Sequence, residues 1–306
     1  MKNKRMLGNI MLFFTAIVWG TAFVFQRTGM ELIEPITFSF TRMYLAAAAL
    51  SLVALIKDRS DLKKGISPSQ TMSPEEYKKY KKNTLVGGIC CGICLSGGSF
   101  FQQMGIVYTT AGKAGFITAM YMLLVPIIGV IFLRKRVQWL AWVAVVIGAA
   151  GLYLLSIKEG FTVTKGDALV MVCALCFALH ILCCDHFAGT GNPLRISMLQ
   201  FLTVAVIGTV IAFITETPTW EKILSAAVPI LFCGLLSGAL GYTLQMIAQK
   251  YTDPTVASLL MSLESVFAAI SGALILHETM SPRELIGCII MFIAIVLVQI
   301  PLPERK

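Results

Sequence analysis

Charged residues are scarce in this sequence: they make up 13% of its 306 residues, against 57% hydrophobic residues, and the mean hydropathy is +0.80. Because globular domains carry about 25% charged residues, the composition argues against a soluble protein. The apolar residues fall into ten blocks of roughly 20, long enough to cross a hydrocarbon layer of about 30 Å. These blocks lack the apolar-polar alternation of a membrane β-barrel. We therefore predict an all-α membrane protein.

Enzyme motifs are also missing. The chain has no G-x-S-x-G elbow, no HExxH, no Walker loop and no pair of carboxylates on one predicted membrane helix. It also lacks a soluble nucleotide-binding domain that could drive transport with ATP. We expect no enzymatic activity and no cofactor, so that movement of a solute would depend on a gradient, on exchange or on downhill flow.

The nine cysteines all lie within the apolar blocks. Cys173 and Cys176 have CxxC spacing, but there is no second CxxC pair and no soluble loop that could supply further metal ligands. We expect the cysteines to act as small packing residues and predict no metal site.

The predicted spans are 8–26, 36–56, 84–105, 113–133, 137–157, 166–186, 194–214, 225–248, 254–276 and 282–300. The basic start of the chain resembles a secretory signal, but no small-x-small cleavage site follows it, so we expect an uncleaved first span. With ten spans, 18 Lys and Arg residues lie on one side and 6 on the other. The positive-inside rule then places both termini in the cytoplasm. We expect the protein to lie in the inner membrane of a bacterium.

The net charge of +9 therefore orients loops and indicates no nucleic-acid partner. Loop 57–83, which is rich in Lys, is expected to anchor the topology. Docking of this loop on anionic lipid is the alternative.

The chain repeats itself in two halves. Pro35 matches Pro193 and Ser39 matches Ser197 at an offset of 158, whereas later matches such as Ala114 with Ala257 have an offset of 143. Each half holds five spans, an odd number, so the second half must enter the membrane from the opposite side. We predict two inverted repeats, 1–157 and 166–306 with a short cytoplasmic tail, joined by an external linker at 158–165. Inverted repeats are typical of secondary transporters.

Three ionisable residues lie inside predicted spans, where they mark function or a paired contact. Glu264 lies about 15 Å deep, near the midplane, and could exchange a proton or bind a cationic group, or fix helix packing as a neutral or paired carboxyl. Arg42 could snorkel, pair with another helix, or bind a substrate carboxylate or Glu264. His180 is either a hydrogen-bonded packing residue or a ligand contact.

Polar stripes on two predicted helices point to the protein interior. Ser96, Ser99 and Gln103 share a face of the third span, and Ser237, Gly241 and Gln245 share a face of the eighth, its repeat partner. Amides need hydrogen-bond partners in hydrocarbon, so the stripes should line a helix contact or a wet cavity. We predict that Gln103 and Gln245 line one cavity from opposite halves. Trp19 lies on a similar face of the first span, where core packing is the alternative to ligand contact.

Several segments resemble those of a known family. They are Trp19 to Val24 (WGTAFV), Arg42, Lys113 to Thr118 (KAGFIT) with Leu124 to Pro126, Ala248 to Thr252 (AQKYT), Leu263 to Ala268 (LESVFA), and His277 with Glu278. In order and over nearly the whole chain, they resemble the EamA-type members of the drug/metabolite transporter (DMT) superfamily. The resemblance implies ten helices in two inverted repeats, a central cavity, and export of amino acids or other small metabolites.

The sequence departs from the family pattern at two places. Ser265 stands where the family has the proline of its E-P, which leaves a helix kink there in question. Lys135 stands at the first-half counterpart of Glu278, so the acidic residue that often closes the fourth helix is absent.

We predict a secondary transporter that exports a small polar or amphipathic metabolite, with amino acids as one candidate class, by alternating access. The expected substrate-binding residues are Trp19, Gln103, Tyr121, His180, Gln245 and Glu264, with Glu264 also the coupling group and Arg42 a structural or substrate ion pair. The first alternative is a proton-coupled importer or exchanger of organic ions. A second alternative, of another class, is a membrane sensor or scaffold that transports no solute.

Overall fold

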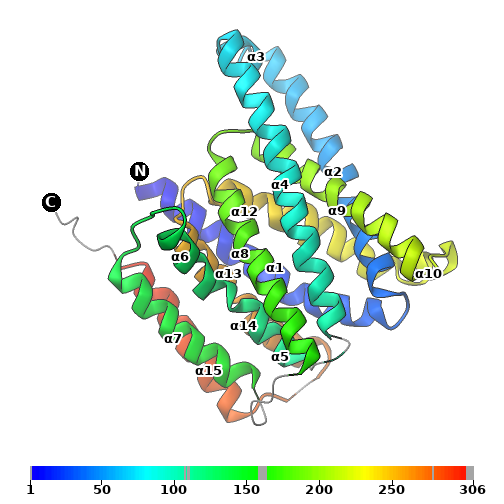
Figure 1. Cartoon of the computed structure of the whole chain (residues 1–306), viewed down its shortest axis with the longest axis vertical. Coiled ribbons are helices and arrows are strands. Elements are labelled where there is room, and N and C mark those ends of the chain that lie inside the picture. Colours follow the sequence, from blue (N-terminus) through cyan, green and yellow to red (C-terminus); the bar gives the residue numbers. More distant parts are fainter. Residues whose placement is uncertain (1, 107, 109–110, 158–163, 278, 301–306) are drawn as a thin grey trace.

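The computed structural model describes residues 2–106, 108, 111–157, 164–277 and 279–300, which form helices, turns and bends without a strand (Figure 1). The prediction of an all-α membrane protein is confirmed. The helices are α1 (Lys2–Met30), α2 (Pro35–Lys63), α3 (Pro68–Thr71), α4 (Pro74–Ile106), α5 (Ala111–Ala119), α6 (Tyr121–Ile131), α7 (Trp139–Ser156), α8 (Lys165–Ala188), α9 (Pro193–Thr215), α10 (Trp220–Ser225), α11 (Ala227–Leu231), the π-helix η1 (Phe232–Tyr242), α12 (Thr243–Ala248), α13 (Pro254–Met261), α14 (Glu264–Ile275) and α15 (Pro282–Val298).

Nine helical segments in the described part of the chain are long and apolar enough to cross a membrane. The remaining predicted span is α15, whose 17 residues cover about 26 Å, close to the thickness of the hydrocarbon layer. Exposed apolar side chains such as Val210, Phe213 and Val296 on α9 and α15 give these helices a lipid-compatible outer face. Two of the predicted spans are interrupted, one between α5 and α6 and one between α13 and α14. A third passes without a break from α11 through the π-helix η1 into α12.

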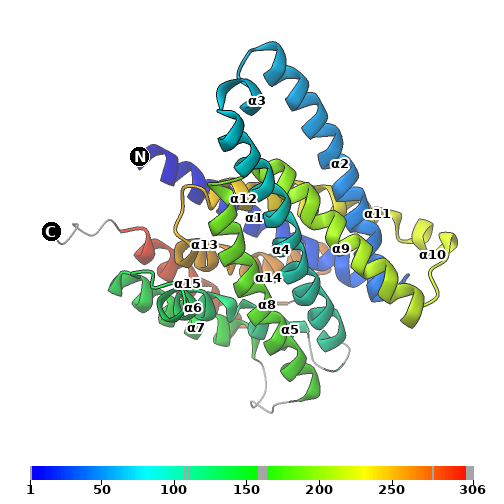
Figure 2. The ribbon, with the colours of Figure 1, turned by 45° about the horizontal axis from the view of Figure 1, so that its top comes forward.

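The loop predicted at 57–83 is largely helical. α2 and α4 run several turns past the predicted spans and form, with α3, a hairpin that projects beyond the other helices (Figures 1 and 2). The charged residues there favour helix in water, and a cap starts α4, because Ser73 N–H donates to Glu76 Oε2 at 2.9 Å. An exposed ion pair between Arg195 on α9 and Asp58 joins the hairpin to the second half.

The packing of the helices reflects the predicted repeat. α7 packs on α15 at one corner of the bundle (Figures 1 and 2), and α2 packs on α9. α4 packs on α8, and η1, the counterpart of α4, packs on α1, the counterpart of α8. In the same way α6 packs on α8, and α14, the counterpart of α6, packs on α1. Each contact therefore joins an element of one half to an element of the other, as expected for two five-helix repeats that exchange places about a two-fold axis.

The fourth and ninth spans are broken at matching points. Met120 separates α5 from α6 and Leu263 precedes α14, at positions 143 residues apart, and both have nearly the same backbone geometry (φ −60°, ψ −11° and −13°). The break in the second half needs no proline at Ser265, because the Ser262 hydroxyl donates to the carbonyl of Leu259 at 2.7 Å and supports a tighter turn. Glu278, named above in the closing motif, lies outside the described residues.

Candidate functional site

A central cavity of about 60 Å³ lies where the two halves meet. Its lining comes from α1, α2, α4, α5, α6, α8, η1, α12, α13 and α14, whereas α7, α9 and α15 contribute no lining residue. Six pairs of lining residues are related by the repeat offsets of 158 or 143: Trp19 with Phe177, Phe23 with Ile181, Ser99 with Tyr242, Gln102 with Gln245, Thr118 with Met261, and Tyr121 with Glu264. The cavity is therefore lined by corresponding residues of the two predicted repeats.

Tyr121 and Glu264, which correspond in the two predicted repeats, meet at the cavity. They are the first residues of α6 and α14, so the two matched helix breaks place them at the cavity. The Tyr121 hydroxyl donates to Glu264 Oε1 at 3.1 Å, and both side chains are buried. The repeat thus brings together a phenol from one half and a carboxyl from the other, both of which the sequence analysis expected in the binding site.

Arg42 reaches the same cavity from α2 and is buried, with 7% of its surface exposed. A snorkelling arginine would expose its guanidinium at the membrane surface, so this alternative does not describe the side chain. The guanidinium lies over the Phe38 ring, 5.3 Å from its centroid, and within the described residues Nε has no hydrogen-bond partner. No ion pair joins Arg42 to Glu264 among the described side chains.

The amides are arranged differently from the expectation. Gln102 and Gln245 line the central cavity, whereas Gln103 lines a separate small pocket with Ser39 and Gly208. The expected pairing of Gln103 with Gln245 in one cavity is therefore wrong by one residue, since successive residues of an α-helix point about 100° apart. The repeat offset of 143 also relates Gln245 to residue 102.

Gln245 has one unsatisfied group at the cavity. Its amide Nε2 donates to Gln249 Oε1 at 3.0 Å, and Gln249 in turn donates to the Ile181 carbonyl at 2.9 Å. In the described part of the chain Gln245 Oε1 finds no donor. A buried acceptor without a partner is costly, which suits a position that a ligand or water would complete.

Trp19 and His180 also line the cavity. Trp19 Nε1 donates to the carbonyl of Ser237 at 3.1 Å, and its ring lies 4.6 Å from the ring of Tyr242. His180 Nε2 lies 2.9 Å from Gln200 Oε1. Both residues thus combine a structural hydrogen bond with a surface turned to the cavity. Tyr242, which the sequence analysis did not select, could have been found as the repeat partner of Ser99.

Gly20, in the WGTAFV segment, allows α1 to approach the start of α14. A Cβ atom at this position would lie 2.4 Å from Phe267 Cβ and 2.7 Å from both the Ala268 nitrogen and the Glu264 carbonyl oxygen. Two of these three atoms belong to the backbone and cannot rotate away. We therefore expect Gly20→Ala to destabilise the folded protein by about 1–3 kcal/mol, measured as a lower melting temperature in detergent.

Gly115→Ala is the matched control, because nothing lies within 4 Å of a Cβ at that position. Alanine favours helix over glycine by up to about 1 kcal/mol, so this variant should melt at the wild-type temperature or above it. Equal melting of the two variants would show that close contact at Gly20 does not hold α14 in place.

The EamA-like transporter family model matches residues 6–157 and 164–300. An uncharacterized transporter of Archaeoglobus fulgidus is 26% identical over 297 residues, which cover 97% of this chain and 87% of that protein. The threonine/homoserine exporter RhtA of Escherichia coli is 27% identical over 167 residues, 53% of this chain and 55% of RhtA. A solved crystal structure shares the fold with a TM-score of 0.76 at 16% identity, over 98% of this chain and 97% of that one.

Proposed function

The chain belongs to the EamA-like transporter family of the DMT superfamily, and from this membership and the charges of its central cavity we propose that it exports a small amino acid by alternating access. The observation that carries the proposal is that Arg42 and Glu264 line one cavity without pairing with each other. A zwitterionic amino acid presents one carboxylate and one ammonium group, which match a cation and an anion held apart.

Arg42 is proposed to bind the substrate carboxylate. Its guanidinium offers donors in a planar fork that suits a carboxylate, and its Nε has no partner in the described structure. Glu264 and the unsatisfied Gln245 Oε1 would accept hydrogen bonds from the ammonium group. Gln102, His180 and Trp19 would complete the walls.

The cavity volume supports a cycle of conformations. By the measure in which one water needs about 10–15 Å³, 60 Å³ has room for about four to six waters, too little for an amino acid with its side chain. Substrate would therefore need the halves to separate on one side at a time, as inverted repeats allow. The breaks at Met120 and Leu263, both beside the cavity, are proposed as the hinges.

Glu264 is also proposed as the coupling group. A carboxyl group near the midplane can exchange its bond with the Tyr121 hydroxyl for one with substrate or with a proton. Export is favoured over import by the similarity to RhtA, an exporter, although this similarity spans about half of each chain.

Counterflow in proteoliposomes tests the function. Vesicles containing the purified protein and loaded with unlabelled threonine or homoserine should accumulate the radiolabelled amino acid from outside, and protein-free vesicles should not. Net flux measured with the solute gradient imposed first in one direction and then in the other separates an exporter from an importer. If no amino acid in the standard set produces counterflow, the protein would not be an amino-acid transporter, and absence of flux with any small metabolite would favour the sensor or scaffold.

We further propose that the protein lies in a bacterial inner membrane with both termini and the hairpin in the cytoplasm, in accord with the bias of Lys and Arg. On the opposite side Lys222 pairs with Glu34, and this hydrogen bond holds the pKa of Glu34 below its ordinary value. The Glu34 carboxylate would therefore stay ionised in neutral medium outside the cell.

Cysteine labelling of intact cells tests this orientation. We expect Glu221→Cys to react with a membrane-impermeant maleimide and Ser69→Cys to react only after the cells are opened. The native cysteines are buried or half-buried, so the unsubstituted protein serves as the background control. Reaction of both positions from the same side would contradict the inverted arrangement.

A further inference from the structure

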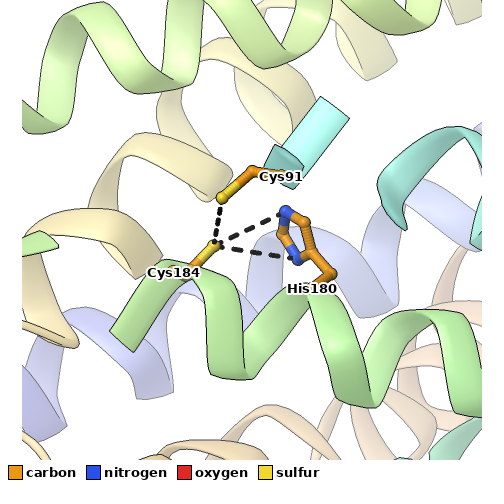
Figure 3. Close-up of side chains that lie close together, drawn as sticks. All are labelled: Cys91, His180 and Cys184. Atoms are coloured by element: carbon orange, nitrogen blue, oxygen red, sulfur yellow. Dashed lines mark hydrogen bonds between the residues drawn. The ribbon is translucent and has the colours of Figure 1, made fainter. Parts of the chain in front are cut away.

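Three side chains with soft donor atoms meet between α4 and α8 (Figure 3). Cys91 Sγ lies 3.9 Å from Cys184 Sγ, and Cys184 Sγ lies 3.5 Å and 3.9 Å from His180 Nε2 and Nδ1. One ligand atom from each of the three residues lies within 4.8 Å of the others. All three residues are at most 1% exposed, so neither lipid nor bulk solvent competes for these atoms.

Helix packing alone does not require these residue types. At the repeat offset of 158, the counterparts of His180 and Cys184 on α1 are Ala22 and Gln26. At the offset of 143, the counterpart of Cys91 on η1 is Gly234. The corresponding positions in the other half therefore hold none of the three donor side chains.

Gln200 on α9 orients the imidazole. Because an amide oxygen only accepts hydrogen bonds, the 2.9 Å contact with Gln200 Oε1 requires His180 to donate from Nε2. The neutral ring then has its lone pair on Nδ1, which lies 3.9 Å from Cys184 Sγ. A ligating histidine that donates its other ring N–H to an oxygen is the usual arrangement in protein metal sites.

The distances suit zinc. An ion with bonds of about 2.3 Å to sulfur and 2.0–2.1 Å to nitrogen in tetrahedral geometry separates two sulfurs by about 3.8 Å and sulfur from nitrogen by about 3.6 Å. The 3.9 Å contacts of Cys184 Sγ with Cys91 Sγ and with His180 Nδ1 lie close to these values. Cys91 Sγ lies within 4.8 Å of a ring nitrogen of His180, so a movement of about 1 Å brings a sulfur and a nitrogen to the distance that zinc requires. His180 also borders the central cavity, which offers a path for the ion and a water as fourth ligand.

We propose that Cys91, His180 and Cys184 bind one Zn²⁺ ion, with water as the fourth ligand. The two thiols release two protons on binding, so two thiolates, a neutral imidazole and Zn²⁺ form a group without net charge. Cu⁺ on the same three ligands would leave one negative charge in a low-dielectric interior, which is costly. The ion would link α4 of the first half to α8 of the second, whatever solute the protein moves.

Zinc titration of the purified, metal-free protein under thiol-free reductant tests the site. We expect one Zn²⁺ per chain and a higher melting temperature with zinc. Cys91→Ser and Cys184→Ser should each weaken zinc binding at least 100-fold, and Gln200→Leu about 10- to 100-fold through the histidine. Cys183→Ser, next in sequence but outside the cluster, should bind zinc within threefold of wild type. Co²⁺ should give a thiolate-to-metal charge-transfer band, roughly halved in intensity by Cys184→Ser.

Several results would overturn the proposal. These are wild-type zinc affinity in both Cys91→Ser and Cys184→Ser, an equal loss of affinity in Cys183→Ser, or a Co²⁺ complex without thiolate bands. Each variant changes sulfur to oxygen at nearly constant size. Cys288→Ser, in a buried site on α15, controls for general effects of such a change on folding.

Discussion

Glu264→Gln is expected to lower kcat/KM for amino-acid counterflow at least 30-fold while the protein stays folded. Glutamine has the size of glutamate and its carbonyl oxygen can still accept the Tyr121 hydrogen bond, but it has no charge for the substrate ammonium group. Removing one partner of a buried charge pair costs about 2–5 kcal/mol, and each 1.4 kcal/mol corresponds to a factor of ten. Counterflow at several substrate concentrations measures the loss.

Two comparisons separate charge from structure at this position. Tyr121→Phe removes the hydrogen bond and leaves the carboxyl, so we expect a loss of about two- to tenfold, in line with 0.5–1.5 kcal/mol for one hydrogen bond. If Glu264 couples transport to protons, wild-type flux should vary with pH and Glu264→Gln flux should not. If Glu264→Gln keeps the wild-type flux and pH response, Glu264 neither binds the substrate nor couples transport to protons.

The spans could be predicted because membrane insertion depends on residue type and length, both of which are visible in the sequence. Each of the ten apolar blocks corresponds to one, two or three consecutive helical elements in the structure, and the mismatch at 57–83 has a simple cause. Hydropathy detects where a helix leaves the hydrocarbon, whereas α2 and α4 continue as helices in water, where Lys and Glu also favour helix.

The site was harder to predict because it depends on rotation about helix axes. Gln102 and Gln103 both lie on α4, and a difference of one residue decides which of two pockets each amide enters. The repeat offset of 143 contains the missing information, since it relates Gln102 to Gln245 and Tyr121 to Glu264. When one half contributes a residue to the cavity, its partner should be sought 143 residues away in the other half.

The cluster around His180 has a weaker signal in the sequence. His180 and Cys184 are four residues apart and so share one helix face, a spacing that suits two metal ligands. Cys91 lies 93 residues away and joins them only because α4 packs on α8. A search for CxxC pairs therefore could not find this group.

Arg42→Gln is expected to reduce kcat/KM at least 30-fold for amino acids but only a fewfold for the corresponding amino amides, which lack the carboxylate. The guanidinium is the cation that we assign to the substrate carboxylate, and its loss leaves that carboxylate buried without a partner. Arg42→Lys should recover part of the activity, because it keeps the charge and loses the planar fork.

Arg195→Gln provides the control for loss of a positive charge. Arg195 pairs with Asp58 at the exposed base of the hairpin, and an exposed ion pair contributes about 0–1 kcal/mol, so flux and stability should change little. Equal losses of flux for amino acids and amino amides in Arg42→Gln would instead assign the arginine to packing, because the two solutes differ only in whether they carry a carboxylate or a neutral amide. The ratio of flux between the two solutes thus tests the chemistry of the site even if a variant of Arg42 lowers the amount of active protein.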